Sequence, residues 1–190
     1  AFVSVLMAFG IDAALPAFDE LRRDFGLDAL GLSPAITGTP YFVGMAIGQL
    51  IFGVLADRFG RRPIMMVGLS IYALGAFGAA SAGGLEVLLA ARFVWGLGAA
   101  APAVLRMAIA RDLYAGERMA RVVSLVTAVF LIGPIVVPFI GEWILLTGSW
   151  RAVFAVAIAL AAVALAWAFA FGETLAPEHR QPLRIRPITR

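Results

Sequence analysis

Two charged residues lie inside long apolar stretches of this sequence, where a charge is costly to bury. Asp12 falls within the run from Phe2 to Leu15, and Arg92 lies seven residues after Leu85, near the start of another run. At the centre of a bilayer each charge costs at least about 2.5 kcal/mol. If both runs cross a membrane, the two side chains lie at similar depth and can form an ion pair or a water-linked pair. A buried carboxylate near an arginine is suited to binding and releasing a proton, whereas the plainer alternative is an ion pair that only fixes helix packing.

Three more polar residues lie within apolar runs and are candidates for a substrate cavity. Tyr41 and Gln49 are eight residues apart, which places them roughly on one side of a helix. Arg106 follows Arg92 by fourteen residues, on nearly the same helix face and about 21 Å further along the axis. The alternatives are that Tyr41 and Gln49 pack between helices and that Arg106 extends to water at the membrane surface.

The sequence offers no arrangement of residues for covalent chemistry. No nucleophile is paired with a base, and we find neither a cluster of metal-ligating residues nor a phosphate-binding loop. We therefore expect a protein that is not an enzyme, with no catalytic residue, no metal site and no cofactor. Cysteine is absent from the sequence, which excludes disulfides and thiolate ligands within it.

Composition places the chain in a membrane. Hydrophobic residues make up 62% of the 190 residues and charged residues only 14%, whereas a soluble domain is about half apolar and about a quarter charged. The apolar runs are close to the length of a spanning helix, which favours helices over a β-barrel. The net charge of +3 comes from arginine alone among the basic residues, and membrane topology explains it better than a nucleic-acid partner does.

Six apolar runs are predicted to form transmembrane helices. They extend from Phe2 to Leu15 and over about Ala35–Ala56, Pro63–Ala80, Leu85–Ala110, Val122–Leu146 and Ala152–Phe171. The first run is too short to span about 30 Å at 1.5 Å per residue. We therefore expect its opening turn to be missing, with a cleaved signal peptide as the alternative. Pro134 and Pro138 are expected to interrupt the fifth run. The predicted fold is an all-α half-bundle over residues 1–172, followed by a polar connecting segment over 173–190.

Arginines concentrate on one side of the predicted membrane. The turns after the second and fourth runs and the tail hold ten of the fifteen, namely Arg58, Arg61, Arg62, Arg111, Arg118, Arg121, Arg180, Arg184, Arg186 and Arg190. The opposite side holds Arg22 and Arg23, in the polar connection Pro16–Pro34, and Arg151. By the positive-inside rule, both chain ends are expected in the cytoplasm of a bacterium, with the helices in its inner membrane.

A faint internal repeat supports this topology. Gly53 and Gly60 precede Arg62-Pro63 at the third run, and Gly141 and Gly148 precede Trp150-Arg151 at the sixth, with the same spacing between the glycines. The two turns fall on opposite membrane faces, as three-plus-three inverted repeats require.

The turn between the second and third runs is the most specific motif. It reads Gly53-Val54-Leu55-Ala56-Asp57-Arg58-Phe59-Gly60-Arg61-Arg62-Pro63. Its glycines relieve backbone crowding, and its arginines hold the turn in water at a membrane surface. This segment resembles, at every defining position, the signature loop between transmembrane helices 2 and 3 of the major facilitator superfamily. The resemblance implies that Gly53, Asp57, Arg58, Gly60, Arg61 and Arg62 form a loop that gates the cytoplasmic side.

Other segments resemble one group of that superfamily, the Bcr/CflA-type drug:proton antiporters. Asp12-Ala13-Ala14-Leu15-Pro16-Ala17 is similar to its helix-1 pattern and Arg92-Phe93-Val94-Trp95-Gly96-Leu97-Gly98 to its helix-4 pattern. Gly133, Pro134, Pro138 and Gly141 resemble the antiporter motif of helix 5. The resemblance implies a central cavity lined by helices 1, 2, 4 and 5, with Asp12 and Arg92 as coupling residues. It also implies a second, carboxy-terminal half of six helices, which is absent from this sequence.

These observations together favour the amino-terminal half of a proton-coupled multidrug efflux antiporter that works by alternating access. The expected partners are a drug-like small molecule, protons, the lipid bilayer and the missing six-helix half. One alternative is a metabolite or sugar transporter of the same superfamily. The other is a truncated membrane module that transports nothing.

Overall fold

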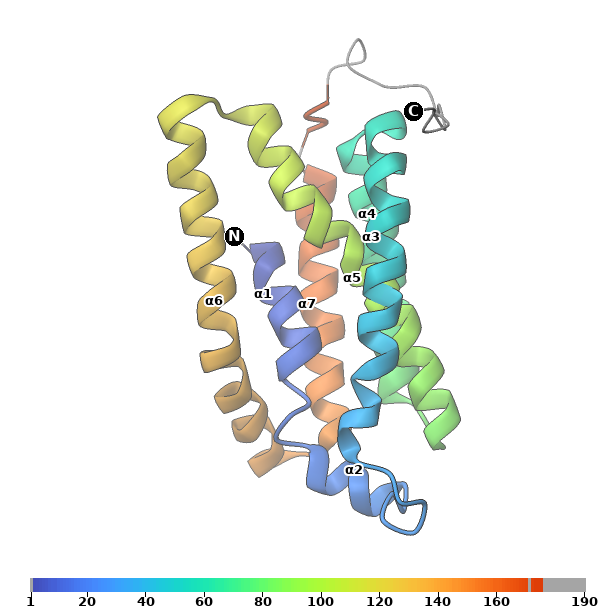
Figure 1. Cartoon of the computed structure of the whole chain (residues 1–190). Coiled ribbons are helices and arrows are strands. Elements are labelled where there is room, and N and C mark those ends of the chain that lie inside the picture. The colour runs from blue at the N-terminus through green and yellow to red at the C-terminus, as the bar shows by residue number, and fades with distance from the viewer. Residues whose placement is uncertain (1, 171, 176–190) are drawn as a thin grey trace, which may run out of the picture.

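The computed structural model describes residues 2–170 and 172–175, and these form only helices, turns and connecting segments (Figure 1). The elements in chain order are α1 Phe2–Asp12, α2 Phe18–Asp24, the 3-10 helix η1 Pro34–Thr37, α3 Thr39–Phe59, α4 Arg61–Ala80, α5 Leu85–Leu113, α6 Gly116–Thr147 and α7 Trp150–Ala170. The long helices stand side by side in one bundle, and the short α2 lies across one end of it. The predicted all-α fold is confirmed.

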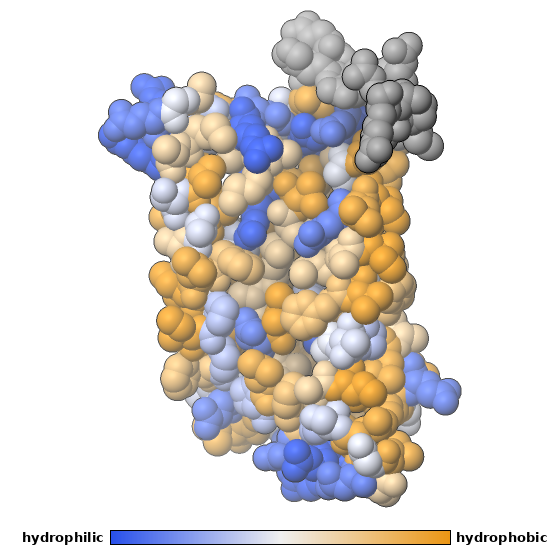
Figure 2. Space-filling view, in the orientation of Figure 1, coloured by the Kyte–Doolittle hydropathy of each residue, from blue (hydrophilic) through white to orange (hydrophobic). Residues whose placement is uncertain are grey.

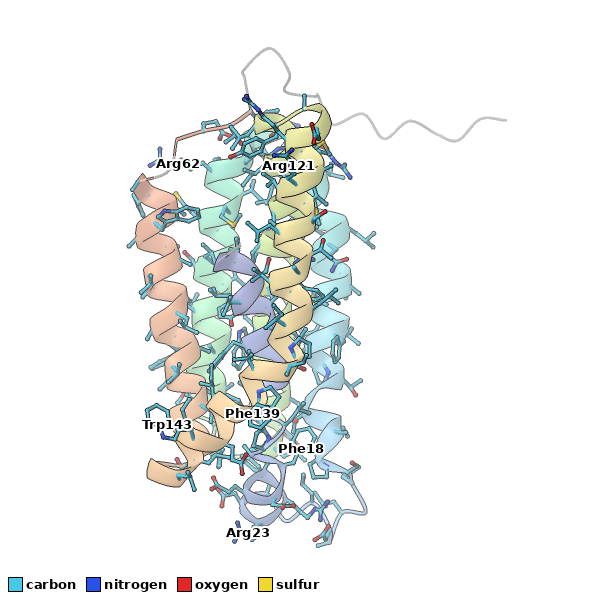
Figure 3. All side chains as sticks on the ribbon, turned by 90° about the vertical axis from the view of Figure 1, so that its left-hand side faces the viewer. Phe18, Arg23, Arg62, Arg121, Phe139 and Trp143 are labelled. Carbon is cyan, nitrogen blue, oxygen red and sulfur yellow. The ribbon has the colours of Figure 1, made fainter. Side chains whose placement is uncertain are left out.

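Five helices in the described part of the chain are long and apolar enough to cross a membrane, namely α3 with η1, α4, α5, α6 and α7. The sixth, α1, is apolar but has only 11 residues, fewer than the roughly 20 that a span needs. Figure 2 shows hydrophilic residues gathered at both ends of the bundle and mostly hydrophobic residues between them, with a few hydrophilic residues in the middle of this face. Arg62 and Arg121 lie at one end, and Arg23 lies at the other (Figure 3). The chain is a multi-pass membrane protein.

Glycine lets α3 and α4 pack tightly against α5. A Cβ atom added to Gly44 of α3 would collide with the carbonyl oxygen of Phe93, and one added to Gly98 of α5 would collide with the backbone of Tyr72. Without a hydrophobic driving force between helices in lipid, close backbone approach of this kind supplies the packing energy. Gly48, one turn after Gly44, also faces α5, where an added Cβ atom would collide with the Leu97 carbonyl oxygen and the Ala100 side chain.

The glycines of the antiporter motif make the corresponding face on α6. Added Cβ atoms would meet Ala8 at Gly133 and the carbonyl oxygen of Ala13 at Gly141, so both glycines pack against α1. Of the two prolines between them, Pro134 is exposed and Pro138 is half-buried. The small-residue stripe of α6 therefore holds the helix that carries Asp12.

Several predicted boundaries were wrong. The helix α6 runs unbroken through Pro134 and Pro138, because a proline removes one backbone hydrogen bond and can kink a helix without ending it. It also starts at Gly116, not Val122, since Glu117 and Arg121 pair at 2.7 Å one turn apart in its first turns. Hydropathy marks the part of a helix that lies in lipid, so it misses polar turns beyond it.

The first connection also differs from its prediction. The helix α1 ends at Asp12 rather than Leu15. Pro16 contributes to this earlier end, because a proline disfavours helical geometry at the residue before it. The connection that follows contains the short helix α2, whose Leu21 is fully buried. The predicted linker over 173–190 lies outside the described residues beyond 175.

The two turns of the predicted inverted repeat lie at opposite ends of the bundle. The helix α4 begins at Arg61, directly after Gly60, and α7 begins at Trp150, two residues after Gly148. Their starts are at the top and the bottom of Figure 1, respectively. Each start receives a carboxylate: Glu173 accepts from the Arg61 amide at 2.9 Å, and Glu20 accepts from the Trp150 amide at 2.9 Å.

Candidate functional site

Arg92 lies near the start of α5, and its side chain is almost fully buried, with 2% of the residue exposed. Its Nε donates to the carbonyl oxygen of Thr37 at 3.1 Å, and its Nη1 donates to that of Gly10 at 2.8 Å. The guanidinium also lies over the rings of Tyr41 and Trp95, 4.8 and 5.0 Å from their centroids. Backbone oxygens and aromatic faces therefore compensate the buried charge.

Asp12, the last residue of α1, is half-buried. No hydrogen bond or ion pair of its carboxylate occurs within the described residues, so the direct ion pair between Asp12 and Arg92, one of the expected arrangements, is not formed. The guanidinium instead reaches the carbonyl of Gly10, whose position lies about 200° around α1 from Asp12. Glu86 near the start of α5 and Glu142 of α6 are exposed.

Tyr41 and Gln49 occupy different environments, although both are on α3. Tyr41 is fully buried, and its hydroxyl has no hydrogen-bond partner among the described residues. That hydroxyl fills the space where a side chain at residue 10 would lie, so Gly10 is required for this packing. Gln49 is exposed on the surface of the bundle. Neither residue lines the cavity beside Arg106 or a second cavity beside Arg92.

Arg106 does line a cavity. This cavity of about 310 Å³ lies between the first turn of α1 and helices α4, α5, α6 and α7, and Arg61 and Trp167 also contribute to it. The Nη1 of Arg106 donates to the Ser4 hydroxyl at 3.3 Å, and its guanidinium lies 4.6 Å from the ring centroid of Phe130. Arg106 thus connects α5 to α1 and α6, and it forms no ion pair within the described residues.

A charge network joins three helices about 30 Å along α5 from Arg92. The Arg61 guanidinium binds Asp57 of α3 at 2.6 Å and Asp112 of α5 at 3.0 Å. The Arg61 side chain is 11% exposed, so these contacts are better shielded from water than surface ion pairs. The signature turn therefore fixes the ends of α3, α4 and α5 to one another.

Glu173, just after α7, extends this network. Its carboxylate accepts hydrogen bonds from the backbone amides of Arg61, at 2.9 Å, and Arg62, at 3.3 Å, which are unpaired donors of the first turn of α4. Gly60 supplies the positive φ of 105° that opens the turn, and a side chain there would collide with Glu173. The Arg62 side chain completes the link by donating to the carbonyl oxygen of Phe169 at 2.6 Å.

The ionisation of Glu173 reflects these contacts. Partial burial alone would raise the pKa of its carboxyl group. Hydrogen bonds from the amides of Leu175, Arg61, Arg62 and Thr174 outweigh burial and hold the pKa below its usual value of 4.5. The carboxylate is therefore held in its charged form at the helix start.

The other predicted residues of this loop lie around the network. Arg58 is exposed, with its guanidinium 5.2 Å from the ring centroid of Phe59. Gly53 is half-buried beside Val104. Sequence reasoning missed the contacts of Asp112, Glu173 and Gly10, because each partner is distant in the sequence.

A family model described as Major Facilitator Superfamily matches residues 1–189 of this chain. A relative in Haemophilus influenzae, the "Bicyclomycin resistance protein homolog", is 38% identical over 189 residues, which cover 99% of this chain and 47% of that protein. Multidrug resistance protein MdtL of Shewanella oneidensis is 37% identical over 145 residues, covering 76% of this chain and 36% of MdtL. The chain spans less than half the length of these relatives.

Solved structures share the fold. The proton:xylose symporter XylE, bound to 6-bromo-6-deoxy-D-glucose, superposes with a TM-score of 0.80 at 18% identity, over 91% of this chain and 43% of XylE. The human organic anion transporter MFSD10 gives a TM-score of 0.72 at 21% identity, over 94% of this chain and 48% of that chain. At these identities the likeness shows the fold alone.

Proposed function

Because the chain belongs to the major facilitator superfamily, we propose that it is the amino-terminal half of a proton-coupled multidrug efflux antiporter. The observation that carries this proposal is Asp12, a half-buried carboxylate at the end of an apolar helix, without a side-chain partner in the described residues. The names of the relatives, bicyclomycin resistance and multidrug resistance, support a drug-like substrate.

The proposed cycle is alternating access between this half and a carboxy-terminal half. A proton binds Asp12 from the outside, and the drug binds the state open to the cytoplasm. Each ligand shifts the equilibrium only by the difference in its affinity for the two states. The drug cavity lies between the halves, on the side formed by α1, α3, α5 and α6, with Arg106 near its inner mouth.

The network around Arg61 is the proposed cytoplasmic gate. Asp57, Asp112 and Glu173 hold the ends of α3, α4, α5 and α7 together at the arginine-rich end of the bundle. This end faces the cytoplasm in a bacterial inner membrane, on the positive-inside argument. Both chain ends then lie inside the cell.

The names of the relatives favour a drug over a sugar as the substrate. The likeness to XylE is a likeness of fold at 18% identity, so it carries no information about the substrate. The more similar relatives, at 37–38% identity, are named for drug resistance.

The test is drug uptake into inverted membrane vesicles that contain the full-length transporter, with and without an inward-acid pH gradient. The wild type is expected to accumulate drug only with the gradient, and Asp12→Asn to lose this accumulation. Glu142→Gln is the matched control, because it neutralises an exposed carboxylate of α6. Uphill uptake by Asp12→Asn at wild-type levels would rule out Asp12 as the coupling site.

A further inference from the structure

Arg92 binds one carbonyl oxygen at the end of each of two helices. Gly10 is in the last turn of α1, and Thr37 is the last residue of η1, directly before α3. The Gly10 carbonyl, in the last turn of α1, has no partner within the helix and carries the negative end of the α1 dipole. The Thr37 carbonyl ends the four-residue 3-10 helix η1. A guanidinium that bridges two such carbonyls joins two helix ends with one side chain.

The surroundings of Arg92 leave its charge without a carboxylate partner. The titratable groups around it are Asp12 on α1, Tyr41 on α3 and Tyr72 on α4, while α7 contributes the ring of Phe154. The Asp12 carboxylate makes no ion pair with Arg92 in the described residues. Two backbone carbonyls and the aromatic rings are the partners of this buried guanidinium within the described residues.

We propose that Arg92 is a positioning residue that fixes the outer end of α1 to η1, and not the counter-ion of Asp12. It places Asp12 through the backbone, because Gly10 precedes Asp12 by two residues. This inference rests on the proposed function only in that Asp12 is taken as the proton site. The bridge needs the planar fork of arginine, since Nε and Nη1 each bind a different helix end.

Replacing Arg92 by lysine distinguishes a role of its hydrogen-bonding geometry from a role of its positive charge. Lysine keeps the positive charge but has a single ammonium group, so it cannot reproduce the two-pronged bridge. If Arg92 acts as a bridge, Arg92→Lys and Arg92→Gln have the same effect. If it acts as a counter-ion, Arg92→Lys behaves like the wild type, and Arg92→Gln raises the midpoint pH of drug binding by about one unit or more.

The experiment uses the full-length transporter with spin labels at Leu15→Cys, just after α1, and Val43→Cys on α3, in a background without other cysteines. Both positions are exposed, at 45% and 47%. The distance distribution between the labels is measured by pulsed electron spin resonance, and drug affinity is measured against pH without labels. Arg111→Gln is the control, because it removes an exposed arginine of α5 and leaves both bridged carbonyls in place.

The bridge predicts that Arg92→Lys and Arg92→Gln both broaden the distance distribution and that Arg111→Gln does not. It also predicts that both Arg92 variants share one midpoint pH. A narrow, wild-type distribution with Arg92→Lys, together with a wild-type midpoint, would overturn the proposal even if Arg92→Gln failed to fold. A wild type whose drug affinity is independent of pH would refute the proposed coupling, while the label distances would still decide whether Arg92 is a bridge.

Discussion

Two buried tyrosine hydroxyls in this half-bundle differ in whether they have a hydrogen-bond partner. The Tyr72 hydroxyl donates to the carbonyl oxygen of Leu6 at 2.8 Å, whereas the equally buried hydroxyl of Tyr41 has no partner in the described residues. Both rings pack edge-on against Trp95. The two tyrosines therefore form a matched pair that differs in hydrogen bonding.

The first prediction concerns this pair. Tyr72→Phe should lower the stability of the full-length protein by about 1 kcal/mol, because it removes a made hydrogen bond and leaves a carbonyl unpaired. Tyr41→Phe should leave stability unchanged or raise it, since an unpaired buried hydroxyl is itself unfavourable. Unfolding temperatures of the purified variants measure the difference. An equal loss in both variants would mean that the Tyr41 hydroxyl has a partner.

Glycine substitutions give a second prediction, again from a matched pair. A Cβ at Gly44 would collide with the backbone of α5, whereas one at Gly53 would make ordinary contact, at 3.8 Å, with a side-chain atom of Val104. Gly44→Ala should therefore cost about 1–3 kcal/mol through overpacking. Gly53→Ala should cost far less. Equal unfolding temperatures for the two variants would argue against the close approach of α3 and α5.

At the scale of elements, the start of α4 depends on Glu173, and this gives a prediction for pH. The pKa of Glu173 is held below 4.5 in the folded protein, so the native state binds a proton less readily than the unfolded chain does. The stabilisation from this carboxylate is therefore present above pH 4.5 and is lost as the pH falls through the lower native pKa.

Unfolding temperatures of wild type and Glu173→Gln, measured from neutral pH down through this range, test the prediction. The wild type should be more stable at neutral pH, and the gap between the two should close in acid. Glu142→Gln, at an exposed carboxylate of α6, should show no such closing gap. A constant difference between wild type and Glu173→Gln at all pH values would remove Glu173 as the cap of α4.

Much of the helix framework could be predicted from the sequence, because apolar runs of membrane length have few alternatives. The cores of α3, α4, α5 and α7 follow from such patterns. The helix α2 was missed, since five of its seven residues are charged and its hydropathy is low. The course of α6 through Pro134 and Pro138 was also missed, because proline signals alone do not distinguish a kink from a break.

The site was harder to predict than the helices. Intramembrane charge identified Asp12 and Arg92, but a sequence does not show backbone carbonyls as partners, so the bridge from Arg92 to Gly10 and Thr37 was not foreseen. The same limit applies to Glu173, which acts on backbone amides across 112 residues of sequence. Contacts of this kind depend on where helix ends meet in space.

At the scale of the whole molecule, the charge asymmetry predicts an orientation. Arg61 should face the cytoplasm and Asp24, beside Trp150 at the other end of the bundle, should face the outside. Cysteines placed at these two positions in intact cells can be tested with a thiol reagent that does not cross membranes. Labelling at position 24 and protection at position 61 are expected, and the reverse pattern would invert the topology.

The most direct test of the central claim is drug binding to the purified full-length transporter as a function of pH. Protonation of Asp12 and drug binding are proposed to favour different states, so wild-type affinity should weaken as the pH falls. Asp12→Asn should bind drug with an affinity that does not change with pH, because its side chain no longer titrates. An Asp12→Asn variant with the wild-type pH profile would contradict the account and place the coupling site elsewhere.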